Sequence, residues 1–223
     1  MVVNIYYVRH GDPDYEHDTL TELGHKQAKL TGEVLKDIPF DMVFASTSGR
    51  ALLTCSYLTK LINKEPVKLE WMLEAKAWHN FASFNKTLNR DSWIYHNVDL
   101  LKKMKELQND DKWYEDKDFS PNVKEGIDRF SKEVDEWLLS MNIVHNRKNK
   151  TFSSTGKNPK NIILFAHEGA GTGFLSSIMD LNYAYFITNY PRLACCSITH
   201  IQITLDNKTP NQFIRYNDIS HLK

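Results

Sequence analysis

The sequence predicts an α/β fold, a three-layer α/β/α sandwich with a mostly parallel sheet. Residues 2–7 and 161–166 are short apolar runs rich in β-branched and aromatic residues, which is typical of buried strands. Segments with apolar residues at helical spacing alternate with strand-like segments, as in consecutive βαβ units. At 223 residues, the chain is long enough to bury a sizeable core, and we expect a single domain over residues 1–223.

The helix signals are strongest where a capping residue precedes an apolar stripe. Thr21 is a predicted N-cap, and Ser120-Pro121 begins the clearest helical pattern in the chain, which runs to Met141. The other expected elements are a strand at 41–46, a helix at 50–62, a strand at 66–69, a helix after Gly169 and closing strands at 197–205 and 212–216.

Two segments carry no clear strand or helix pattern. Residues 75–120 interleave aromatic and polar side chains, and we expect short helices and loops without a strand, forming a lid over the carboxyl ends of the sheet. Residues 145–160 are polar, basic and rich in turn formers, so we expect an exposed loop with His145 in solvent.

The composition limits the classes of function. Hydrophobic residues make up 41% and charged residues 25% of the chain, and 28 basic residues balance 28 acidic ones. This balance argues against nucleic-acid or membrane partners recruited by global charge. No apolar run approaches the ~20 residues of a membrane span, and no secretory signal is evident. Cys55, Cys195 and Cys196 lack the spacing of a disulfide framework or a zinc site, so we expect reduced thiols and a cytoplasmic location. The oligomeric state is left open.

Both buried strands end in a histidine that is followed closely by glycine. His10 and Gly11 follow the first strand, and His167 and Gly169 follow the other. If these strands are parallel neighbours, both imidazoles face the crevice beyond the strand ends, where α/β proteins bind ligands. Histidine can act as a nucleophile, and glycine at Gly11 would let a bulky anion approach the backbone.

Two arginines and a helix N-terminus are expected at the same place. Arg9 ends the first strand, and Arg50 begins the helix that follows the strand expected at 41–46. The helix after Gly169 would direct unpaired N–H groups toward the same crevice. Together with the imidazoles, these groups suit a dianion such as a phosphate monoester.

The chain resembles the histidine phosphatase superfamily, also called the phosphoglycerate mutase-like family, in its larger branch. The matching segments are Val8-Arg9-His10-Gly11, residues 20–28, residues 45–55, Leu73-Glu74, residues 165–169 and residues 216–222. The resemblance covers nearly the whole chain.

The resemblance implies a role for each matching residue. His10 would be the nucleophile that becomes phosphorylated, with Arg9, Arg50 and His167 binding the phosphoryl oxygens. Glu74 would be the general acid and then the general base. These cationic groups and donors would stabilise the transferred charge, so we expect no metal and no other cofactor.

Glu168 departs from the family pattern. The larger branch has glycine after the second histidine, whereas the smaller branch, with acid phosphatases and phytases, places an acid there and uses it as proton donor. Glu168 is therefore a rival to Glu74, and Glu168 and Gly169 join Arg9, Gly11 and Arg50 as candidate substrate-binding residues. Residues 47–49 and 77–80 also depart from the pattern, which leaves the substrate open.

The leading functional hypothesis is a metal-independent phosphatase that hydrolyses a small phosphomonoester through a phosphohistidine. One alternative is a cofactor-dependent phosphoglycerate mutase. Such mutases usually continue the signature with Glu-Ser and a nearby Trp-Asn, whereas residues 12–15 read Asp-Pro-Asp-Tyr, which favours hydrolysis. A second alternative is a catalytically inactive protein that binds phosphorylated ligands.

Overall fold

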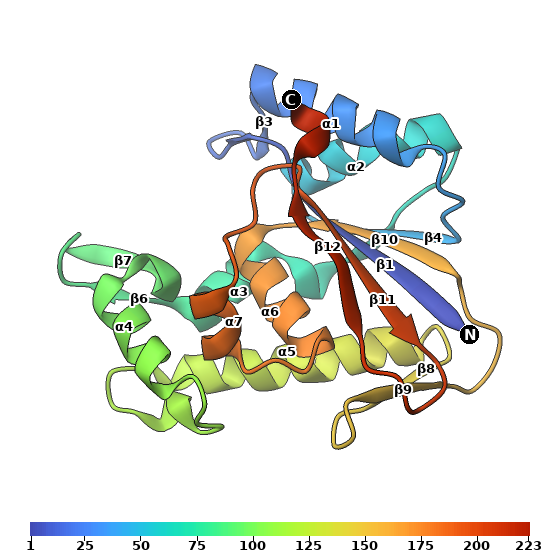
Figure 1. The fold of residues 1–223 in the computed structure, drawn as a ribbon. Helices are drawn as coiled ribbons and strands as arrows, with labels where there is room; N and C mark the ends of the chain where they lie inside the picture. The colour runs from blue at the N-terminus through green and yellow to red at the C-terminus, as the bar shows by residue number, and fades with distance from the viewer.

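The computed structural model describes residues 1–223 and has an α/β architecture with a mixed, mostly parallel sheet (Figure 1). The sheet has six strands, in the spatial order β12 (Gln212–Asp218), β11 (Ile198–Thr204), β1 (Val2–Arg9), β10 (Asn161–Ala166), β4 (Met42–Ser46) and β5 (Val67–Leu69). Strands β1, β10, β4 and β5 are parallel to one another, and β11 and β12 add an antiparallel edge next to β1. The predicted α/β fold is confirmed.

Helices cover both faces of this sheet (Figure 1). The helices are α1 (Glu22–Leu35), α2 (Gly49–Ile62), α3 (Glu74–Phe81), α4 (Val98–Leu107), α5 (Pro121–Leu139), α6 (Glu168–Ile178) and α7 (Tyr183–Asn189), with short 3-10 turns at Glu70–Met72, Ile94–His96, Trp113–Glu115 and Ser220–Leu222. None of these helices combines the length and the apolar character that a membrane span requires.

Alternating side chains of the strands enter two separate cores. On β10, Ile163 and Phe165 pack with α1 and α2, whereas Ile162 and Leu164 face the larger core that contains α5 and α6. This alternation follows from the twofold period of a strand, and it explains why both long strands are apolar at nearly every position.

The predicted helix starts are observed. The Thr21 side chain accepts a hydrogen bond from the N–H of Gly24 at the start of α1, and the Ser120 side chain accepts one from the N–H of Asn122 at the start of α5. Each cap satisfies an amide that has no partner within its helix.

The expectation that residues 75–120 contain no strand is wrong. After α3, a hairpin of β6 (Ala82–Asn85) and β7 (Arg90–Trp93) precedes α4. The hairpin turn holds Asn89 at a positive φ of 48° without any glycine, so the usual turn signal is missing from the sequence.

The expectation of an exposed loop at 145–160 is also wrong. Strands β8 (Ile143–Asn146) and β9 (Thr151–Ser154) form a second hairpin. A separate two-stranded sheet is formed by the short strands β2 (Pro13–Asp14) and β3 (Thr19–Leu20). The His145 side chain is fully buried, and its ring nitrogens lie 2.9 Å from carboxylate oxygens of Asp135 and Asp180.

Candidate active site

His10 lies at the carboxyl end of β1, where the strand gives way to a turn. Its Nδ1 lies 2.7 Å from the carbonyl oxygen of Gly11. A carbonyl only accepts hydrogen bonds, so this contact places the ring proton on Nδ1 and leaves Nε2 unprotonated. Arg50 Nε donates toward that Nε2 at 3.4 Å. Burial lowers the pKa of His10 to about 3, and the positive charges of Arg9 and Arg50 act in the same direction. His10 is therefore a neutral imidazole at physiological pH.

His167 follows β10, which pairs with β1 in parallel with Arg9 opposite Ala166. The two imidazoles consequently lie together, with ring centroids 5.2 Å apart and planes inclined at 63°. His167 Nε2 lies 2.8 Å from Ser46 Oγ and 3.2 Å from Ser48 Oγ. Its Nδ1 is buried and has no partner in the protein. Burial lowers the pKa of His167 well below its usual value, so this ring is also neutral.

Arg9 is hydrogen-bonded on one side of its guanidinium and has no protein partner on the other. Its Nη1 donates to the carbonyl of Leu193 and lies 3.0 Å from Glu168 Oε2. Its Nε is buried without a partner, and Nη2 makes no hydrogen bond within the protein. The Nε–Nη2 edge is the side of a guanidinium that can bind an oxyanion through two parallel hydrogen bonds.

Arg50, in the first turn of α2, is oriented by the β2–β3 loop. Its Nη1 forms an ion pair with Asp18, whose other carboxylate oxygen accepts the N–H of Gly49. Its guanidinium carbon lies 5.4 Å from the centre of the Tyr15 ring. Arg50 was predicted from the sequence, whereas Asp18 and Tyr15 were not, because nothing in an acidic loop indicates which residue folds back.

Glu74 is the first residue of α3 and binds the start of α6. Its Oε1 accepts the N–H of Gly169 at 3.0 Å, and its Oε2 accepts the N–H of Ala170 at 2.9 Å. Burial raises the pKa of Glu74, and the two amide hydrogen bonds oppose that change because they stabilise the ionised form. The N-terminal amides of α6, which we expected to face an incoming anion, are thus occupied by this carboxylate.

Glu168 is 5% exposed and lies between two arginines. Besides Arg9, it accepts hydrogen bonds from Nε and Nη2 of Arg192, which lies in the loop after α7. The guanidinium carbon of Arg192 lies 5.3 Å from the centre of the Tyr95 ring in the lid. Arg192 was not among the candidate residues, since it is 24 positions away from Glu168 and belongs to no motif.

The loop that carries Arg192 is fixed by the last strand. Asn217 of β12 accepts the N–H of Ala194 through Oδ1 at 2.7 Å and donates from Nδ2 to the carbonyl of Arg192 at 2.8 Å. Both hydrogen bonds are made to the backbone, so they set the path of the loop.

Gly11 is needed for packing. A Cβ atom at this position would lie 2.6 Å from the carbonyl oxygen of Gly24 in α1, far inside van der Waals contact. The N–H of Gly11 donates to Thr54 Oγ1 at 3.1 Å. The roles predicted for Gly11, Glu168 and Gly169 in substrate binding stay predictions.

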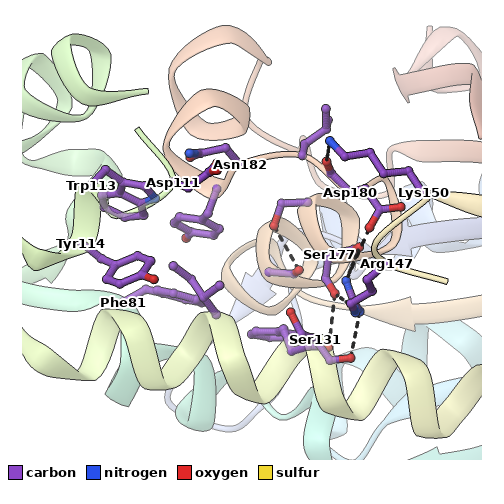
Figure 2. Close-up of a pocket in the computed structure, with 16 residues that line it drawn as sticks. Phe81, Asp111, Trp113, Tyr114, Ser131, Arg147, Lys150, Ser177, Asp180 and Asn182 are labelled. Carbon is purple, nitrogen blue, oxygen red and sulfur yellow. Dashed lines mark hydrogen bonds and ion pairs between the residues drawn. The ribbon is translucent and has the colours of Figure 1, made fainter. Parts of the chain in front are cut away.

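A separate cavity of about 280 Å³ lies between α5, α6 and the start of α7 (Figure 2). Aromatic side chains such as Trp113 and Tyr114 line one end, and Arg147, Lys150 and Asp180 line the other. None of the strand-end residues described above borders it. No cluster of three or more histidine, cysteine, aspartate or glutamate side chains is arranged to hold a metal ion.

The sequence was compared with models of known protein families and with curated proteins. Residues 5–82 match the family model of the histidine phosphatase superfamily (branch 1). Among curated proteins, none matches the chain in sequence.

Solved structures share the fold over the whole chain. A phosphoserine phosphatase mutant from Entamoeba histolytica, in complex with phosphoserine, is 18% identical with a TM-score of 0.62, and the match covers 99% of this chain and 100% of that one. A mycobacterial glucosyl-3-phosphoglycerate phosphatase is 17% identical with a TM-score of 0.62, over 97% and 99% of the two chains. Residues 5–82 of this chain are therefore similar in sequence to branch 1 of the histidine phosphatase superfamily, and the chain shares the fold of the two solved phosphatases over nearly its whole length.

Proposed function

We propose that this protein is a metal-independent phosphatase that hydrolyses a small phosphomonoester through a phosphohistidine on His10. The observation that carries the proposal is the 2.7 Å contact between His10 Nδ1 and the carbonyl oxygen of Gly11, from which the proton position on the ring follows. With the proton on Nδ1 bound to the Gly11 carbonyl, the neutral ring offers the Nε2 lone pair for attack on phosphorus.

The reaction has two displacements at phosphorus. In the first, His10 Nε2 forms a bond to phosphorus as the bond to the leaving oxygen breaks, and that oxygen takes a proton from Glu74. In the second, the Glu74 carboxylate takes a proton from water as the water oxygen attacks the phosphohistidine. Inorganic phosphate leaves with the former P–N electron pair returned to Nε2, and both residues are restored.

Three groups beside His10 are suited to the charge on the phosphoryl oxygens. Arg9 offers its unpartnered Nε–Nη2 edge, and Arg50 keeps Nη2 free of protein hydrogen bonds. Hydroxyl donation from Ser46 to His167 Nε2 would leave the proton of that ring on the unpartnered Nδ1, as a third donor.

The surroundings of the two acids support Glu74 as the proton donor. Glu74 has only neutral amide partners, whereas Glu168 is engaged in ion pairs with Arg9 and Arg192. Burial also raises the pKa of Glu74, which favours the protonated form that an acid needs.

The crowded start of α6 and the similar proteins support a small phosphomonoester as the substrate class. The lid residue Trp93 packs against the start of α6, where a Cβ atom on Gly169 would lie 2.3 Å from the indole. Two of the similar structures are phosphatases of phosphoserine and of glucosyl-3-phosphoglycerate, which are small phosphomonoesters.

The test is hydrolysis of p-nitrophenyl phosphate and O-phosphoserine in the presence of EDTA. We expect release of phosphate by the wild type, loss of turnover in His10→Ala, and unchanged turnover in the control His25→Asn, which alters a histidine on α1. Rapid quenching in alkali should trap an acid-labile phosphoprotein in the wild type only. A wild type that binds phosphate without turning over any ester would refute the proposal and favour a binding protein.

A second assay separates hydrolysis from mutase activity. The protein is incubated with 3-phosphoglycerate, with and without 2,3-bisphosphoglycerate, and both isomers and free phosphate are measured. Hydrolysis predicts free phosphate without the 2-phosphoglycerate isomer. Isomerisation that outpaces phosphate release would overturn the proposal in favour of a mutase.

A further inference from the structure

Arg9, Glu168 and Arg192 form one chain of charges, in which Arg9 and Glu168 are largely buried and the Arg192 side chain is 55% exposed. Glu168 Oε2 lies 3.0 Å from Arg9 Nη1 and 2.7 Å from Arg192 Nη2, and Oε1 accepts from Arg192 Nε. The Arg192 guanidinium therefore binds the carboxylate through two parallel hydrogen bonds, which is the strongest geometry for such a pair. The carboxylate side chain is 6% exposed and that of Arg9 is 14% exposed, so solvent screens the contact between these two groups weakly.

The net charge of this group depends on Arg192. A buried carboxylate beside Arg9 would cancel the positive charge that a dianion needs there, and it would repel the phosphoryl oxygens directly. With Arg192 in place, two guanidinium groups and one carboxylate leave one net positive charge. That charge lies at Arg9, next to His10.

The same contacts fix the orientation of Arg9. Its Nη1 is bound by Glu168 and by the carbonyl of Leu193, the residue after Arg192. Because Nη1 is held on that side, the Arg9 side chain is already ordered before an anion binds. Its unpartnered Nε–Nη2 edge then binds an anion without a further loss of side-chain entropy. Arg192 thus influences both the charge and the orientation of Arg9 from outside the reacting group.

We infer that Arg192 is a positioning residue for the reaction. Through Glu168 it holds Arg9 and neutralises the carboxylate, and the pocket thereby keeps its affinity for a dianionic phosphoryl group. The inference rests on the proposed function, and it accounts for an acid at a position where the resemblance predicts glycine. Arg192 itself does not touch the reacting atoms.

The test measures the Kd of inorganic phosphate by calorimetry, together with KM and kcat for p-nitrophenyl phosphate. The variants are Arg192→Met, Arg192→Lys, Glu168→Gln and the double variant Glu168→Gln/Arg192→Met. Arg215→Met is the matched control, because Arg215 on β12 is exposed and pairs only with Asp218. Thermal unfolding verifies that each variant is folded.

We expect Arg192→Met to raise Kd and KM about tenfold, which is ~1.4 kcal/mol, with a smaller change in kcat. Arg192→Lys should recover part of the loss, because it restores the charge without the planar fork. The double variant should bind phosphate more tightly than Arg192→Met alone, since no unpaired carboxylate remains. The control should match the wild type.

Two results would overturn the inference while leaving the proposed function intact. One is a wild-type Kd in Arg192→Met, and the other is a double variant that binds no better than Arg192→Met. The proposed function fails separately if the wild type binds phosphate but hydrolyses no ester, since the Kd values still test Arg192. A wild type that binds no phosphate would overturn both.

Discussion

Replacing Glu74 with glutamine distinguishes a proton donor from a residue that only shapes the pocket. The wild-type carboxylate accepts amide hydrogens from Gly169 and Ala170. Glutamine retains the size and one acceptor oxygen, but it cannot donate a proton to a leaving group. General acid catalysis typically contributes ~10²–10⁴-fold, or about 3–5 kcal/mol of barrier.

The size of the loss should depend on the leaving group. The serine hydroxyl of O-phosphoserine leaves as a strongly basic alkoxide unless it is protonated, so kcat/KM for this ester should fall by the full ~10²–10⁴-fold. The p-nitrophenolate ion is a weak base that leaves without a proton, and its ester should lose about tenfold or less. The ratio of the two kcat/KM values in wild type and variant is the measurement.

In Glu74→Gln, the side-chain NH₂ group replaces one of the two carboxylate oxygens. It cannot accept a hydrogen bond from the N–H group of α6 that it faces, so one buried donor is left unpaired. This should lower the free energy of unfolding by about 1–3 kcal/mol, so the assays are run well below the Tm of the variant. Glu168→Gln is the control, because its effect should be the same for both esters. An equal loss for both esters in Glu74→Gln, with a leaving-group effect in Glu168→Gln, would refute the assignment of Glu74.

Three further perturbations test the structure. His145→Ala should lower the free energy of unfolding by about 2–4 kcal/mol, from the void and the carboxylates that lose a partner, and reduce Tm by about 5–15 °C in thermal unfolding without changing kcat; an unchanged Tm would contradict this. Gly169→Ala should displace Trp93 from the start of α6 and reduce kcat/KM at least about tenfold, whereas wild-type kinetics would show that the indole moves freely. His10 has a pKa of about 3 when folded and an ordinary value near 6.5 when unfolded, so the unfolded state binds the extra proton between these values and stability falls as pH falls through that window. In urea unfolding, the wild type should lose ~2–3 kcal/mol more stability between pH 7 and pH 4.5 than His10→Ala does, because His167 contributes to the loss in both proteins. Parallel curves would contradict the burial of a neutral ring at position 10.

The sequence was sufficient to predict the sheet and the convergence of the two histidines. The strands that end near His10 and His167 pack against helices on both faces of the sheet, so they are apolar at nearly every position and easy to find, and parallel pairing then brings their ends together. The hairpins were missed for the opposite reason. Their strands are short and largely polar. The turn residues Asn89 and Lys150 have positive φ, and neither is the glycine that would have indicated a turn in the sequence.

The long-range contacts around the candidate site and at His145 could not be predicted, because they join distant segments without any local pattern. His145 was placed in solvent, yet its hairpin packs so that two carboxylates from other elements enclose it. Arg192 and Glu168 meet only because the loop after α7 returns to the start of α6. The amides of α6 looked free in sequence, but Glu74 from a different helix binds them.

The hydrogen bonds from Asn217 to the loop of residues 190–197 have a consequence for biosynthesis. That loop presents Arg192 and the Leu193 carbonyl to Arg9, yet its path is set by β12, which is translated after every other strand of the sheet. A nascent chain can therefore assemble β1, β4 and β10 on the ribosome while the arginine of the first strand still lacks its support. Anion binding should be acquired late in translation, after residues 212–218 have left the exit tunnel.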